Sequence, residues 1–180
     1  MNKFKSYKNL LTFIFCLSPL ITSAQTTTSA NLEVTATVQS ACKISTEPLN
    51  FGNYDPLSTD DLNAQGAVVM NCVAGVAPKI YLGRGINFKD GDRQMSGPNG
   101  ELLKYKLFQP DSTLSGQGCT SKITEWKDSG NNRLITTAST ITGTRRYAVC
   151  GVIPKNQSPT EGAYSDTVVA RFDFLPLIKL

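Results

Sequence analysis

The chain has 180 residues, with 18 Lys or Arg, 14 Asp or Glu and no histidine. The lack of histidine excludes a Ser-His-Asp or Cys-His catalytic arrangement, and no Gly-x-Ser-x-Gly sequence occurs. The formal net charge of +4 is small and the basic residues are scattered, which argues against a nucleic-acid-binding domain.

Residues 1–24 have the pattern of a secretory signal peptide. Three lysines precede an apolar run over residues 10–21, and small residues at 22–24 suit cleavage after Ala24. The run is shorter than the roughly 18 residues needed to span a bilayer, so we expect export rather than membrane anchoring. Removal of three lysines from 18 basic residues leaves 15 against 14 acidic ones, so the mature chain is nearly neutral.

The mature chain opens on an alternating stretch, "NLEVTATVQSAC", at residues 31–42. In an extended strand, successive side chains point to opposite faces. Its apolar residues therefore share one face: Leu32, Val34, Ala36 and Val38. The pattern predicts a strand with one buried face, and it leaves open whether that face packs in its own domain or elsewhere.

Short runs rich in β-branched and aromatic residues continue along the chain, and no helical periodicity lasts more than a turn. They predict strands over residues 49–51, 67–72, 79–82, 102–108, 123–126, 134–141, 147–153 and 167–174. Clusters of Gly, Pro, Asn and Asp separate these runs as turns. So many short strands in one domain predict an all-β fold, an antiparallel β-sandwich.

Four cysteines remain after Cys16 leaves with the signal peptide: Cys42, Cys72, Cys119 and Cys150. An even number of cysteines in an exported chain indicates disulfides, and four cysteines allow three connectivities. Without histidine or a Cys-x-x-Cys spacing, we expect no metal site and no cofactor.

Three polar or aromatic features have alternative interpretations. Asp90 and Asp92 lack the ligand spacing and terminal Glu of a calcium loop, so a hairpin turn is predicted there. Trp126 is predicted in the core rather than on a sugar-stacking platform. Arg145 and Arg146 are interpreted as a solvated strand end. We expect no enzyme, and a self-contained secreted carbohydrate-binding module and a coat or matrix protein stay open as alternatives.

The C-terminal stretch "YAVCGVIPKNQSPTEGAYSDTVVARFDF", residues 147–174, resembles the signature of the spore coat protein U family, which includes the Csu-type subunits of archaic chaperone-usher pili. The signature residues of that pattern are Gly151, Ile153, Pro154, Gln157, Gly162, Tyr164 and Asp166. Upstream, Cys42, "FGNYDP" at residues 51–56, Cys72 and Trp126 follow the family's order.

The resemblance implies an incomplete immunoglobulin-like β-sandwich that is completed by donor-strand exchange. Residues 25–41 are then a donor segment, whose apolar face enters a neighbour, and residues 42–180 form the pilin-like domain. The implied acceptor groove is bordered by the final strand, whose apolar residues share one parity: Tyr164, Val168, Ala170, Phe172 and Phe174. The implied partners are neighbouring subunits, a periplasmic chaperone and an outer-membrane usher.

The resemblance also implies a disulfide between Cys42 and Cys72. Cys150 stands where the family often has an aromatic residue, and its gain together with Cys119 implies a second disulfide. Residues 175–180 extend beyond the family's usual end, and Pro176 should stop strand pairing there. The function implied is a shaft or adaptor subunit of a surface pilus, exported through the periplasm and serving adhesion and biofilm formation. No small-molecule substrate is expected.

Overall fold

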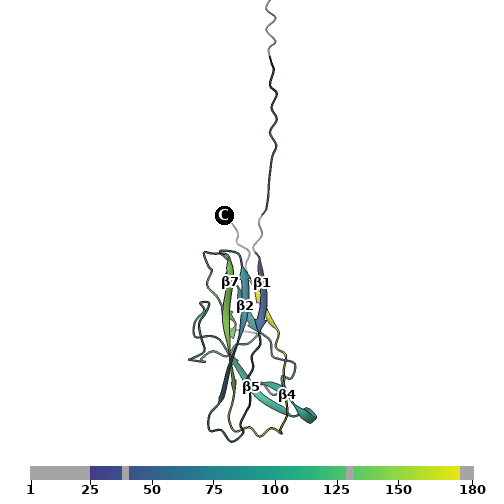
Figure 1. Cartoon of the computed structure of the whole chain (residues 1–180), viewed down its shortest axis with the longest axis vertical. Coiled ribbons are helices and arrows are strands. Elements are labelled where there is room, and N and C mark those ends of the chain that lie inside the picture. Colours follow the sequence, from purple (N-terminus) through teal and green to yellow (C-terminus); the bar gives the residue numbers. More distant parts are fainter. Residues whose placement is uncertain (1–24, 38–40, 129–131, 175–180) are drawn as a thin grey trace, which may run out of the picture. The chain divides into compact units, whose positions relative to one another are not determined.

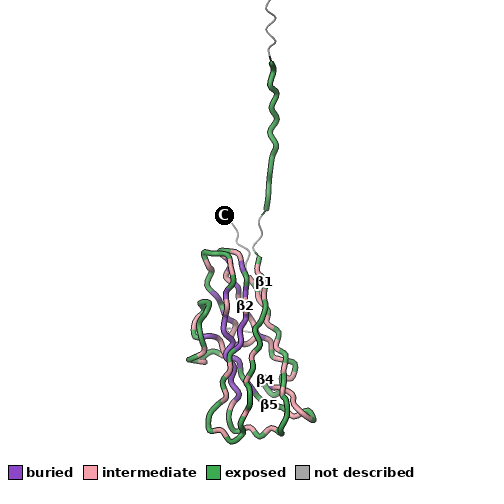
Figure 2. Tube along the Cα trace, viewed as in Figure 1, coloured by how far each residue is buried: buried purple, intermediate pink, exposed green. Residues whose placement is uncertain are grey.

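A computed structural model of the chain describes residues 25–37, 41–128 and 132–174 (Figure 1). The chain divides into two units, Met1–Ala36 and Thr37–Leu180. In the first unit, residues 25–36 are exposed and have no regular secondary structure (Figure 2). The predicted signal peptide, Val38 and the tail at 175–180 lie outside the described residues. Within the described ranges, no helix has the length and apolar character required to cross a membrane.

The larger sheet of the second unit has five antiparallel strands in the order β1-β2-β7-β5-β4. Their bounds are β1 Cys42–Glu47, β2 Leu62–Cys72, β7 Gly143–Ile153, β5 Leu102–Phe108 and β4 Arg93–Ser96. The two central strands, β2 and β7, pair along their whole length, and β1 lies beside β2 (Figure 1). This long pair carries most of the buried residues of the sheet.

The smaller sheet has the order β6-β3-β8, with β6 Leu134–Ile135, β3 Lys79–Leu82 and β8 Ala170–Asp173. Both of its outer strands are antiparallel to β3. A 3-10 turn, η1 Pro98–Gly100, lies between β4 and β5. The all-β sandwich predicted from the sequence is therefore confirmed.

The core lies between the two sheets. Alternate residues of β2 and β7 face those of β3, as the two-residue period of a strand requires: Val68, Met70, Tyr147, Val149, Ile80 and Leu82. Trp126 is fully buried among them, and its indole Nε1 donates a hydrogen bond to the Ile80 carbonyl at 3.0 Å. Trp126 is thus a core residue, as predicted.

Two disulfides link distant parts of the domain. Cys42 pairs with Cys72 directly across the β1–β2 ladder. Cys119 pairs with Cys150 and ties the long connection after β5 to the outer face of β7. The same connection also contacts the backbone of β7, since the Gly116 N–H donates to the Arg146 carbonyl at 2.8 Å. These are the two pairings that the family resemblance implies.

Several strand predictions were wrong. β1 and β4 were not predicted, because "CKISTE" and "RQMS" contain few apolar residues. Residues 49–51 and 123–126 form no strand, and only two residues of the predicted 134–141 strand are paired. Apolar composition marks a segment as buried, but a strand also needs a continuous ladder with a neighbouring backbone, and residues 123–126 meet β5 only at an isolated bridge between Glu125 and Phe108.

The prediction for Arg145 was also wrong. This residue shares the inner face of β7 and is buried, and its guanidinium donates to the carbonyls of Val76 at 2.9 Å and Ile141 at 3.2 Å. Backbone carbonyls satisfy the charge without solvent. The hairpin turn at residues 89–92 is confirmed, since Lys89 and Asp92 exchange both backbone hydrogen bonds.

Candidate functional site

After β1, the chain crosses the inner face of the five-stranded sheet. Two glycines leave the space for this crossing. A Cβ atom added to Gly66 of β2 would lie 2.9 Å from the Leu49 Cβ, and one added to Gly151 of β7 would lie 2.8 Å from both Leu49 and Phe51 side-chain atoms. Residues 49–51 therefore pack against the sheet only because these positions lack side chains. Phe51 then meets the ring of Tyr105 edge-on, with centroids 6.3 Å apart.

The final segment of the domain alternates between the core and solvent. Its inward residues are half-buried against the core: Tyr164, Val168, Ala170, Phe172 and Phe174. Between them, Val169 is 67% exposed, and Arg171 and Asp173 are exposed. This is the alternation that the sequence predicts for the final strand.

An open cleft of about 390 Å³ separates these two segments. Residues 46–51 form one wall and residues 164–168, with Ala170, form the other. The floor is apolar and is made by inward side chains of both sheets: Val68, Leu82, Tyr105, Leu107 and Val149. The cleft is therefore an opening directly above the core.

The cleft continues into a second hollow of about 860 Å³, lined mainly by residues 49–54 and 159–164. The two share four lining residues: Leu49, Phe51, Met95 and Tyr164. Together they form one elongated opening along the side of the sandwich. In the part of the chain that the structure describes, β1 has no strand partner on the edge away from β2, and β8 has none on the edge away from β3. The arrangement can accept one more extended, apolar segment.

Polar side chains anchor the segments that border the cleft. The Tyr164 hydroxyl shares its one proton between two acceptors, the Thr160 carbonyl at 3.0 Å and Glu101 Oε2 at 3.2 Å. Hydrogen bonds from the Thr160 backbone N–H and hydroxyl to Glu101, at 2.8 and 2.7 Å, lower the pKa of Glu101. The carboxylate therefore stays ionised as a fixed acceptor at neutral pH.

The Gln157 side chain acts as a substitute strand partner for β5. Its Oε1 accepts from the Lys104 N–H at 2.9 Å, and its Nε2 donates to the Lys104 carbonyl at 3.0 Å. The backbone N–H of Gln157 donates to the Tyr54 hydroxyl at 3.0 Å. These bonds connect the loop after β7 with the segment that follows β1, and so hold the two sides of the second hollow together.

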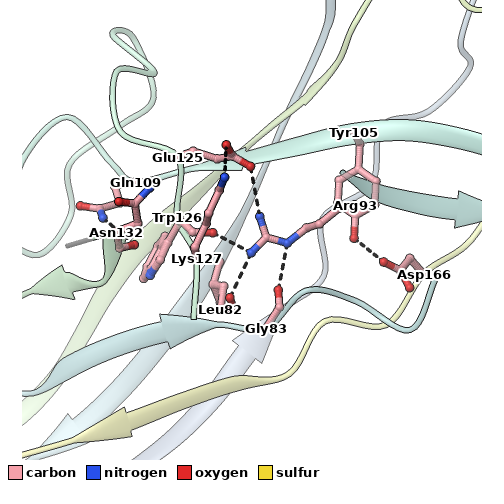
Figure 3. A network of polar contacts seen from close by, with 10 residues as sticks. All are labelled: Leu82, Gly83, Arg93, Tyr105, Gln109, Glu125, Trp126, Lys127, Asn132 and Asp166. Carbon is pink, nitrogen blue, oxygen red and sulfur yellow. Dashed lines mark hydrogen bonds and ion pairs between the residues drawn. The ribbon is translucent and has the colours of Figure 1, made fainter. Parts of the chain in front are cut away.

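A buried arginine binds the backbone carbonyls at the C-terminal end of β3 (Figure 3). Arg93 donates through Nε to the Gly83 carbonyl at 2.9 Å and through Nη2 to the carbonyls of Leu82 and Trp126 at 3.0 and 2.6 Å. Burial lowers the pKa of Arg93. The sequence did not predict this residue in the core, because arginine is almost never fully buried unless it is paired.

The residues of the predicted donor face are solvent-exposed. Leu32 is 86% and Val34 is 83% exposed, Ala36 is exposed, and Val38 lies outside the described residues. Among the described residues, no strand lies in the apolar cleft, and the apolar side chains of Leu32 and Val34 are not buried. Sequence reasoning placed the final strand at the groove but missed the opposite wall, for which the apolar run at 49–51 was the available signal. Within the described ranges, no three or more His, Cys, Asp or Glu residues gather as a metal site.

Comparison with known families identifies the chain. Residues 28–171 match the family model of the Spore Coat Protein U domain. The chain therefore belongs to the Spore Coat Protein U domain family, which confirms the resemblance seen in the sequence.

Two known proteins resemble the chain over most of its length. It is 28% identical to Protein U of Myxococcus xanthus, in an alignment of 190 residues that covers 97% of this chain and 100% of the relative. Its fold is similar to a chain in the crystal structure of the CsuC-CsuE chaperone-tip adhesion subunit pre-assembly complex from the archaic chaperone-usher Csu pili of Acinetobacter baumannii. The TM-score is 0.51 at 22% identity, covering 75% of this chain and 40% of that chain. The chain thus spans about two fifths of the length of that solved chain.

Proposed function

We propose that this protein is a structural subunit of an archaic chaperone-usher surface pilus, and that donor-strand exchange assembles it. The observation that carries the proposal is the elongated apolar cleft between residues 46–51 and 164–170. Family membership and the fold similarity to a chaperone-subunit complex support the same assignment.

The donor segment has the chemistry that the cleft requires. Its apolar face carries Leu32, Val34, Ala36 and Val38, and full burial of a Leu or Val side chain contributes about 1.5 to 3 kcal/mol. Its backbone pairs with the free edges beside the cleft, while the apolar side chains fill the floor. A slip of one residue turns Glu33 inward, so the register is specified.

The topology of the domain favours one direction for the donor. The domain's own chain enters at Cys42, which pairs with Cys72 at one end of the sandwich. In a head-to-tail stack, the neighbour's donor arrives from the opposite end of the sandwich, where residues 52–56 and 159–163 line the second hollow. Its residue 38 therefore stays at that end and Leu32 lies farthest in, antiparallel to residues 164–170.

The open cleft explains the need for other partners. An apolar core exposed along one side promotes aggregation, so a periplasmic chaperone occupies the cleft until an outer-membrane usher joins the subunits. One donor segment at residues 25–41 and one acceptor domain at 42–180 suit a shaft or adaptor position. Displayed at the cell surface, the fibre serves adhesion and biofilm formation.

Deletion of residues 25–39 tests the proposal. The shortened chain should still form a complex with its co-expressed chaperone and accept a peptide of residues 31–38, but it should not donate to a further subunit. Native gel electrophoresis of the exchange products measures both properties.

Val34→Asp should stop incorporation into fibres and spare the chaperone complex, because a carboxylate then faces the apolar floor. Glu33→Gln is the matched control and should be nearly silent.

The opposite result is equally specific. If the deletion unfolds the isolated domain and the peptide restores nothing in trans, residues 32–38 are an ordinary strand of their own sandwich.

A coat or matrix protein is a second candidate, favoured by the family's spore-coat name and by the full-length similarity to Protein U. Electron microscopy of the assembled material separates a fibre from a coat layer. The carbohydrate-binding alternative is not favoured, because Trp126, its candidate sugar-stacking residue, is fully buried.

A further inference from the structure

One carboxylate on the cleft wall connects the final segment to two other parts of the domain, β5 and the connection after β3. Asp166 lines the cleft and is half-buried. Its Oδ2 accepts a hydrogen bond from the Tyr105 hydroxyl of β5 at 2.6 Å (Figure 3). Its Oδ1 accepts from three backbone N–H groups, those of Ile86 at 2.8 Å, Thr167 at 2.9 Å and Asn87 at 3.3 Å. Asp166 therefore bridges the two layers of the sandwich beside the cleft floor.

The connection after β3 is shaped to admit this carboxylate. Gly85 has a φ of +87°, and a Cβ atom there would overlap the Asp166 carboxyl group. Any other residue would have to displace Asp166 as well as adopt a strained backbone. Burial and the bond to Asp166 raise the pKa of Tyr105, so the hydroxyl stays protonated as a donor.

At its start, this wall is also held by the Tyr164 hydroxyl, through its contacts with Thr160 and Glu101. Before β8, the segment is held by a pair of backbone hydrogen bonds between Ser96 and Ser165, at 2.9 and 3.0 Å, and by the Gly83 N–H bond to the Val169 carbonyl at 2.8 Å. Its other edge faces the open cleft. A binding edge that is already ordered lowers the entropy cost of capturing a strand.

We propose that Asp166 is a positioning residue for donor capture: it holds residues 164–170 as a ready-made cleft wall before a donor arrives. This inference rests on the proposed donor-exchange function. Once a donor is bound, its backbone hydrogen bonds to the domain keep residues 164–170 in place. Asp166 therefore acts on the association rate of the donor rather than on its dissociation rate.

The final segment supplies a matched control. Asp173 accepts a hydrogen bond from the Tyr81 hydroxyl at 2.7 Å, much as Asp166 accepts one from Tyr105. Asp173 lies on the exposed face of β8, opposite in parity to the residues that line the cleft. The two residues share the hydroxyl-to-carboxylate bond, whereas only Asp166 faces the cleft and also accepts from the backbone N–H groups of Ile86, Asn87 and Thr167.

The test measures capture of a fluorescent peptide of residues 31–38 by the full chain in complex with its co-expressed chaperone. Asp166→Ala should slow association about tenfold, as expected for the loss of about one net charge-assisted hydrogen bond, and leave the dissociation rate within about twofold. Asp173→Ala should change neither rate by more than about twofold. Asp166→Asn should restore capture, because its amide oxygen still accepts from Ile86 and its amide nitrogen donates to the Tyr105 oxygen.

Each other outcome overturns the inference. Asp166 has no positioning role if Asp166→Ala associates with the peptide as fast as wild type, if Asp173→Ala slows association equally, or if Asp166→Ala changes the association and dissociation rates equally. In each of these cases, capture of the peptide by the wild-type chain still supports the proposed function. If Asp166→Ala yields no complex, Tyr105→Phe against Tyr81→Phe decides by the same criteria. If the wild-type chain captures no peptide, donor exchange itself fails, and the inference falls with it.

Discussion

Single side chains complete the hydrogen bonding of backbone that no strand covers. Gln157 pairs with both backbone groups of Lys104, and Arg93 holds three carbonyls at the end of β3. Buried backbone groups without a partner are costly, so a sandwich with an open side needs such substitutes at its margins. This gives a physical reason for the polar residues of the C-terminal signature.

Asp111 provides a prediction about pH. Hydrogen bonds from the backbone N–H groups of Thr120 and Ser121 and from the Thr120 hydroxyl lower the pKa of Asp111 from 3.8 to about 2. Because the folded-state pKa is depressed, the carboxylate stabilises the fold above about pH 4, and this contribution is lost as the pH falls toward 2. Asp111→Asn should lower the unfolding temperature of the peptide-complemented chain at neutral pH.

The difference between Asp111→Asn and wild type should shrink steadily between about pH 4 and pH 2. Thermal unfolding followed at several pH values measures it. A difference that stays constant down to pH 2 would show that the ionised carboxylate is not what holds this loop.

At the scale of elements, local pattern predicted strands only where apolar residues are dense. The bounds of β3 and β5 agree with the predicted residues 79–82 and 102–108. β1 and β4 escaped prediction because they are sheet edges, whose residues need only backbone pairing on one side. The final strand was predicted with the right alternation, but only Ala170–Asp173 is paired with β3.

Val168 and Val169 are adjacent valines on opposite faces of the final segment, so they test its orientation. Val168 lines the cleft and packs on the core, whereas Val169 is 67% exposed. Val168→Asp should strongly reduce the yield of chaperone complex, because an unpaired buried carboxylate costs on the order of several kcal/mol. Val169→Asp should stay close to wild type. The amount of co-purified chaperone measures both.

Equal losses for the two aspartate variants would contradict the assignment of residues 164–170 as a cleft wall. A folding defect of Val168→Asp that donor peptide and chaperone leave unchanged would instead indicate a core that is already complete.

At the scale of the whole molecule, the proposed assembly places one donor and one acceptor on each chain, which make a heterologous contact between successive copies. Such contacts generate open filaments when the rotation between copies does not close a ring. In the proposed fibre, stability is shared between neighbours, since each domain is completed by another chain.

Trp126 allows this shared stability to be measured. It is the single tryptophan of the chain and is fully buried, so its fluorescence reports unfolding of the core. A peptide of residues 31–38 should raise the free energy of unfolding by about 2.7 kcal/mol at one hundred times its dissociation constant. Denaturant titrations at increasing peptide concentration check this. A peptide with Val34 changed to Asp should give no such increase, and equal stabilisation by both peptides would contradict specific filling of the cleft.

The sequence by itself determined the all-β class, the family and the alternation of the final segment. These follow from residue types and from the two-residue period of a strand, which are properties of neighbouring positions along the chain. Only the tertiary structure decided that residues 46–51 and 164–170 form opposite walls of one cleft, that Gly66 and Gly151 admit the first wall, and that Asp166 meets Tyr105 beside the floor. This cleft exists only between segments distant in sequence, so no local pattern can encode it.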